Sequence, residues 1–263
     1  MDELTKAIVE QSEGVLQETY KDIVSPSAKP VGIMLSLLPR TIRLGLSKWE
    51  KWVINGEESL RLTAQALKEK VDKIPEEKQC EPEPYIAVPA IQQISYCYDS
   101  EELRELYANL LASSMNTEKK TTVHPSFVDI IKQLTPDEAK ILSRMPRTSV
   151  QNLPLIDVAI KVKDGGEHAC ARNIISPTFY DLCEHPESMS GYIENLKRLQ
   201  LIDIPSHQSL TDVTLYNVIL ESEMVKTLKR TTVLPESMEW KINKKTFNVT
   251  DFGVDFIQCC VDE

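Results

Sequence analysis

The feature that most constrains the fold is the stretch from Glu83 to Met145, where helix start signals, stop signals and apolar spacing agree. Asp99 followed by Glu102 matches a capping box, and apolar residues then recur at helical spacing. The recurring residues are Leu103, Leu106, Tyr107, Leu110 and Leu111. Thr135 opens a second box, with proline at the first helical position. The pattern predicts an all-helical central module.

Two further helices are predicted inside this module. Pro89 is expected to start one that carries Ile91, Ile94 and Tyr98, and His124-Pro125 to start another. A local hydrogen bond is the simplest role for His124. The acidic pairs Glu101-Glu102 and Asp137-Glu138 fall in first helical turns, where capping and the helix dipole account for them.

The N-terminal region, residues 1–80, is predicted to be helical and amphipathic. Its uncharged stretch from Val31 to Leu38 is too short to span a bilayer. Residues 29–51 carry five Lys and Arg against one Glu, a local net charge of +4. The candidates for membrane contact are Arg40, Arg43, Lys48, Trp49, Lys51 and Trp52. Such a segment suits either an anionic membrane surface or a buried helical hairpin with a cationic outer face.

A helix from about Glu57 to Ile74 should follow and end at Pro75. Residues 75–84, rich in proline and glutamate, have the composition of a linker. The predicted organisation is therefore residues 1–80, a central helical module at 81–146, and a C-terminal domain at 147–263.

The C-terminal domain is expected to mix helices and strands. Residues 153–162 predict a strand closed by a turn at 164–166, and residues 192–199 predict a helix leading into a strand at 201–205. A helix is expected at 211–229, although the β-rich sequence LTDVTLYNVIL leaves a strand open there. Alternating apolar residues around Asn243-Lys244-Lys245 predict a hairpin. Thr250 should cap a last helix.

This order of elements is winged-helix-like. The predicted fold class is mainly α, and α+β overall, with helical N-terminal and central modules followed by a winged-helix-like α+β part. In a nucleic-acid-binding version of that fold, four cations are the candidates for phosphate contact: Lys197, Arg198, Lys244 and Lys245. The formal net charge of −10 disfavours broad binding to nucleic acid phosphates.

The cysteines suggest packing rather than chemistry. The six are scattered without a CxxC pair, and no signal-peptide pattern opens the sequence, so reduced thiols in the cytoplasm are expected. His168, Cys170, Cys183 and His185 could in principle hold zinc, but the single-residue gap within each pair is tighter than usual for such sites. No cofactor is expected.

No motif for catalysis is present. The sequence has no Gly-rich phosphate loop, GxSxG elbow or HExxH helix. We therefore expect a protein that is not an enzyme.

The central motifs ELRELYANLLASSM, HPSF and IIKQLTPDEAKIL resemble those of the abortive infection alpha family of bacterial and phage genomes. The resemblance extends upstream through residues 70–77 and 81–84 and downstream to Val249-Thr250-Asp251-Phe252-Gly253, covering about residues 65–263. One departure is Gln200, where glycine is common at such a helix-to-strand junction. The resemblance implies a role in defence against phage, by halting or killing the infected host, and brings no catalytic residues.

Two classes of function follow. The first is a non-enzymatic, cytoplasmic defence protein that senses a phage component or binds a protein partner. In one version of this function, residues 29–55 also contact the inner face of the membrane. The second is a winged-helix regulator that binds nucleic acid.

Overall fold

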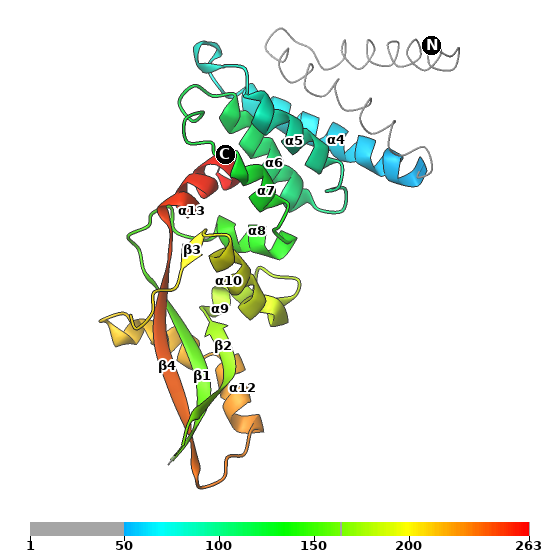
Figure 1. Ribbon diagram of the computed structural model, residues 1–263. Coiled ribbons are helices and arrows are strands. Elements are labelled where there is room, and N and C mark those ends of the chain that lie inside the picture. Colours follow the sequence, from blue (N-terminus) through cyan, green and yellow to red (C-terminus); the bar gives the residue numbers. More distant parts are fainter. Residues whose placement is uncertain (1–49, 164, 263) are drawn as a thin grey trace. The chain divides into compact units, whose positions relative to one another are not determined.

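A computed structural model describes residues 50–163 and 165–262 (Figure 1). The chain divides into two compact units. Unit 1 contains residues up to Pro136 together with the segment from Cys259, and unit 2 runs from Asp137 to Gln258. The predicted boundaries near residues 80 and 146 stay predictions.

From Glu50 onward, unit 1 contains the helices α4 (Glu50–Val71), α5 (Pro84–Ile94), α6 (Glu101–Ser114) and α7 (Ser126–Ile131). The apolar stripe predicted for α6 forms the core, because Leu106, Tyr107, Leu110 and Leu111 are all nearly inaccessible to solvent. Helix α4 lies along α6 and ends at Val71, close to the predicted stop. The helical character predicted for the central stretch is confirmed.

The predicted start of α6 was wrong by one residue. Ser100, not Asp99, caps the helix, and its Oγ accepts a hydrogen bond from the Leu103 backbone N–H at 3.2 Å. Ser100 is buried, whereas Asp99 is exposed. Both residue types cap helices well, so the sequence alone did not distinguish them.

The predicted linker is part of the packed unit. Helix α4 is followed by a 3-10 turn, η2 (Glu76–Lys78), and Cys80 then donates its backbone N–H to Met115 O at 2.9 Å. Thr117 N donates to Lys78 O at 2.9 Å. Helix α5 begins at Pro84, earlier than predicted, so Pro89 lies inside it. The proline and glutamate composition of residues 75–84 correctly predicted the end of a helix. It wrongly predicted a linker, because this segment is packed within unit 1.

The C-terminal end of the chain completes unit 1. A π-helical turn, η5 (Ile257–Val261), brings its carbonyl groups against α6. Asn109 Nδ2 donates to Cys260 O at 3.0 Å, and Ser113 Oγ donates to Cys259 O at 2.9 Å. Cys259 and Cys260 are buried, consistent with packing rather than redox chemistry.

Unit 2 is organised around a four-stranded antiparallel sheet in the order β2-β1-β4-β3. The strands are β1 (Leu153–Val162), β2 (Glu167–Ile174), β3 (Ile202–Asp203) and β4 (Met238–Val249). Five successive residues of β1, from Leu155 to Ala159, are buried, so both faces of its centre are covered. The strand predicted at 153–162 is confirmed.

The hairpin predicted around Asn243-Lys244-Lys245 was wrong. These residues lie in the middle of β4, which pairs with β1 without interruption from Met238 to Phe247. Trp240 and Ile242 pack against a cluster on one face of the sheet, whereas Phe247 is buried on the other. The first half of β4 therefore buries apolar side chains on one face and the second half on the other. This change interrupts the apolar alternation at residues 243–245, and the interruption led to the prediction of a turn.

Helices cover the two faces of this sheet. On one face, the turn η4 (Val213–Tyr216), α11 (Asn217–Leu220) and α12 (Glu223–Thr231) bury Tyr216, Ile219 and Val225 against Ile156 and Val158. The single helix predicted at 211–229 is thus three short segments. On the other face, α10 (Met189–Arg198) contacts β2. Helix α9 (Pro177–Tyr180) and the turn η3 (Pro186–Ser188) precede α10.

The last helix, α13 (Asp251–Phe256), begins as predicted, with Thr250 Oγ1 accepting from Gly253 N at 2.8 Å. A Cβ on Gly253 would lie 2.0 Å from Leu201 O, so glycine is required for α13 to pack on the junction after α10. Gln200, at that junction, has a φ of 62°, a conformation that glycine adopts without strain.

Candidate functional site

A buried carboxylate pair on α8 (Pro136–Ser143) fixes the surroundings of α10. Asp137 Oδ1 accepts from Glu184 N at 2.9 Å, and Asp137 Oδ2 accepts from His185 N at 2.9 Å and from the Tyr192 hydroxyl at 3.1 Å. Asp137 and Glu138 lie in the first turn of α8 as predicted, but capping and the helix dipole do not account for them fully. Both side chains are buried, and they hold the loop before α10 and the helix itself.

The hydrogen bonds around Asp137 favour one protonation state for Asp137 and one for Tyr192. Burial by itself would raise the pKa of Asp137, but the N–H groups of Glu184 and His185, the Tyr192 hydroxyl and Lys140 outweigh it and lower that pKa. Burial, together with donation to Asp137, raises the pKa of Tyr192 to about 12. Asp137 is thus a charged acceptor and Tyr192 a neutral donor near neutral pH.

Beside α10 lies a hollow of about 650 Å³, which we call the α10 hollow. It is lined by Asn173, Glu194, Lys197, Arg198, Gln200, Ile204, Pro205, Ser206, His207 and Lys245. Three of the four cations predicted for nucleic acid, Lys197, Arg198 and Lys245, line it together. They come from α10 and β4, which are far apart in sequence.

Two of the three cations that line the α10 hollow, Arg198 and Lys245, have side-chain partners within unit 2. Glu138 Oε1 accepts from Asn195 Nδ2 at 2.7 Å, and Asn195 Oδ1 accepts from Arg198 Nε at 3.0 Å and Nη2 at 2.7 Å. On the opposite wall, Lys245 Nζ pairs with Asp157 Oδ2. Groups positioned in advance lose less entropy when they bind a ligand.

Backbone conformation singles out the same place. In the part of the chain that the structure describes, three non-glycine residues have positive φ: Asn173 at 55°, Gln200 at 62° and His207 at 62°. All three line the α10 hollow. Asp157 Oδ1 accepts from the Asn173 N–H at 2.9 Å and so stabilises one of these conformations. Strained backbone of this kind is concentrated at functional sites in proteins.

Lys244, the fourth predicted cation, belongs to the opposite face of the sheet. Its Nζ lies 5.2 Å from the centre of the Tyr216 ring, a cation–π arrangement. Successive residues of a strand point to opposite faces, so Lys244 and Lys245 do not act together. The predicted hairpin would have placed both lysines in one turn, and the prediction grouped them for that reason.

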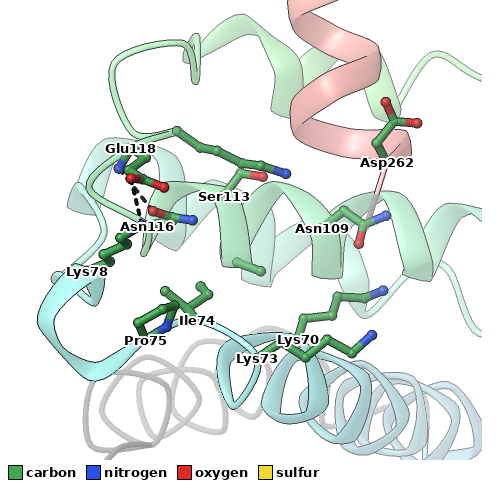
Figure 2. Close-up of a pocket in the computed structure, with 12 residues that line it drawn as sticks. Lys70, Lys73, Ile74, Pro75, Lys78, Asn109, Ser113, Asn116, Glu118 and Asp262 are labelled. Atoms are coloured by element: carbon green, nitrogen blue, oxygen red, sulfur yellow. Dashed lines mark hydrogen bonds and ion pairs between the residues drawn. The ribbon is translucent and has the colours of Figure 1, made fainter. Parts of the chain in front are cut away.

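A second concavity, in unit 1, was not predicted. It has a volume of about 270 Å³ and is lined by Lys70, Lys73, Ile74, Pro75, Lys78, Asn109, Ala112, Ser113, Asn116, Glu118, Lys119 and Asp262 (Figure 2). We call it the lysine pocket. No sequence pattern predicted this pocket, because its walls come from three separate places: the end of α4, the end of α6 and the C-terminal turn.

Comparison with known proteins defines the family. The family model described as abortive infection alpha matches residues 55–260. This chain belongs to the abortive infection alpha family. No curated protein and no solved structure matches it. Both the α10 hollow and the lysine pocket consist almost entirely of residues inside the matched range, with Asp262 just beyond it.

In this abortive infection alpha protein, the four residues considered for zinc do not assemble. His168 and Cys170 are exposed on β2, while Cys183 and His185 follow α9. Cys183 Sγ lies 3.4 Å from Phe179 O, and burial raises its pKa to about 11. Across the described ranges, no group of three or more His, Cys, Asp or Glu side chains is arranged to hold a metal ion.

Most residues considered for membrane contact lie outside the described residues, namely Arg40, Arg43, Lys48 and Trp49. Lys51 and Trp52 fall in the first turn of α4. Within residues 50–163 and 165–262, no helix combines the length and apolar character needed to cross a membrane.

Proposed function

We propose that this protein is a non-enzymatic defence protein of the abortive-infection type, and that it acts by binding a phage component or a protein partner at the α10 hollow. The family match over residues 55–260 supports the role in defence. The site is supported by three cations that line one hollow and by three positive-φ residues that line it.

The defence role is tested by plating phage on cells with and without the gene and scoring host survival. Fewer plaques, together with death or arrest of infected cells, is the expected result. Equal plating of every phage tested would contradict the proposal, and fewer plaques with full survival of infected cells would indicate another kind of defence.

Membrane contact through residues 29–55 is an optional part of this proposal. In that version the protein is cytoplasmic and binds the inner face of the membrane. Removing everything before Lys78 would delete α4, which packs on α6. A better test changes Arg40, Arg43 and Lys48 to Glu in the full chain and measures flotation with anionic vesicles. Equal flotation of variant and wild type would reject the membrane contact.

The second candidate is a winged-helix-like regulator that binds nucleic acid. It is favoured by Lys197, Arg198 and Lys245 lining one hollow, and its wing would have to be the β1–β2 hairpin because residues 243–245 form no turn. Duplex DNA binding should then weaken steeply with salt, and Lys197→Gln with Arg198→Gln should reduce that dependence.

Lys226→Gln, on the exposed side of α12, is the matched control and should leave the salt dependence unchanged. No binding to duplex DNA at low salt would eliminate the nucleic-acid candidate while leaving the defence proposal standing.

A further inference from the structure

The lysine pocket of unit 1 has the construction of a small-ligand site. Three separate parts of the chain converge on it, residues 70–78, 109–119 and Asp262. Figure 2 shows Lys70 and Lys73 on one side, Lys78 paired with Glu118 on another, and Asp262 on the C-terminal segment. The pocket's volume of about 270 Å³ lies just below the range of about 300–1,000 Å³ that is usual for ligand pockets, so it suits a small metabolite.

The charge of the lining favours an anion. Four lysines line the pocket against two carboxylates, Glu118 and Asp262, which leaves a net charge of +2 among the lining residues. Lys70 has a side chain only 10% exposed and pairs at 2.9 Å with Glu105, which does not line the pocket, so the net charge is +1 when that carboxylate is counted. Ammonium groups at a partly dehydrated site attract anions more strongly than the same groups in open solvent.

The rest of the lining is of two kinds. Ile74, Pro75 and Ala112 supply an apolar wall, whereas Asn116 adds a polar side chain. Asn109 and Ser113 are buried, and their hydrogen bonds to Cys260 O and Cys259 O fix the segment that carries Asp262. An apolar wall facing cations matches an organic phosphate better than a bare inorganic anion.

A simpler role for these lysines exists, because cations near the C-terminus of a helix also stabilise the helix dipole. Lys68 occupies the same last turn of α4 as Lys70 but does not line the pocket. A dipole role therefore predicts similar behaviour for Lys68 and the pocket lysines, and a ligand role does not.

We propose that the lysine pocket binds a small organic phosphate of nucleoside monophosphate size, with its phosphate on the lysines and its apolar part against Ile74, Pro75 and Ala112. In this arrangement the phosphate competes with the Asp262 carboxylate for the ammonium groups. The site is separate from the α10 hollow, so it can hold or fail independently of the function proposed above.

The test is calorimetric titration of the full chain with AMP, ribose 5-phosphate, inorganic phosphate and adenosine. Saturable binding of AMP or ribose 5-phosphate with a dissociation constant at or below about 1 mM, and no binding of adenosine, is expected. Binding of adenosine as tightly as AMP, or no saturable binding of any phosphate probe, would overturn the proposal.

Variants with opposite expected effects make the test specific. Lys73→Gln should weaken binding about tenfold, and Asp262→Asn should tighten it about fivefold, because one removes an attracting charge and the other a competing one. Lys68→Gln should leave the affinity unchanged. The proposal would be overturned if Lys68→Gln and Lys73→Gln weakened binding equally, or if Asp262→Asn weakened it. Circular dichroism confirms that each variant is folded.

Discussion

Replacing Asp137 with alanine removes the acceptor on which the surroundings of α10 depend. The carboxylate accepts from the backbone N–H groups of Glu184 and His185 and from the Tyr192 hydroxyl, at distances between 2.9 and 3.1 Å. An intramolecular hydrogen bond contributes about 1 kcal/mol net to stability. The loss of these three partly buried bonds gives an expected decrease of about 3 kcal/mol in the free energy of unfolding.

Urea unfolding followed by circular dichroism measures this loss. Asp181→Ala is the matched control, because Asp181 is exposed at the end of α9 in the same unit. The control should unfold like the wild type. If Asp137→Ala also unfolds within about 0.5 kcal/mol of the wild type, the three hydrogen bonds do not organise the unit and the reasoning is refuted.

The same carboxylate makes unit 2 sensitive to acid. Its pKa is lower in the folded protein than the ordinary value of 3.8, so it contributes stability above that ordinary value and the contribution is lost as pH falls through the folded pKa. Asp137→Asn should therefore show a smaller loss of stability below about pH 4 than the wild type. Identical pH profiles for the two proteins would contradict the assignment.

Three further substitutions test local features. Gly253→Ala should destabilise by about 3 kcal/mol, because the new Cβ would lie 2.0 Å from Leu201 O, and thermal unfolding with no shift in midpoint would contradict this. Gln200→Gly should stabilise by about 0.5 kcal/mol, since its φ of 62° strains any side chain, and a loss in chemical unfolding would count against that view. Ser100→Ala should cost about 1 kcal/mol and Asp99→Ala much less, and the reverse order in urea unfolding would restore Asp99 as the cap of α6.

The elements of this fold that depend on local chemistry were predictable from sequence. The stripe from Leu103 to Leu111, the Thr250 cap and the strand at 153–162 each follow from spacing or capping within a few residues. Helix type and approximate bounds followed from these signals because neighbouring side chains decide them.

What sequence could not supply was the identity of long-range partners. Asp137 and Glu138 have the same sequence pattern as any acidic first turn, yet their partners lie near residues 184–195. Similarly, the two buried faces of β4 depend on which helices cover each half of the strand. The hollow around Lys197 and Lys245 exists only once β4 is continuous, so the sequence could not show that these two cations share a hollow, and the grouping of Lys245 with Lys244 was wrong.

The central claim, that defence depends on binding at the α10 hollow, is tested most directly in infected cells. Cells carrying the wild-type gene, the double variant Lys197→Gln with Arg198→Gln, or the control Lys226→Gln are infected, and plaques and surviving host cells are counted. We expect the control to protect like the wild type and the double variant, present at the same level and folded, to lose protection. Full protection by the double variant would contradict the claim.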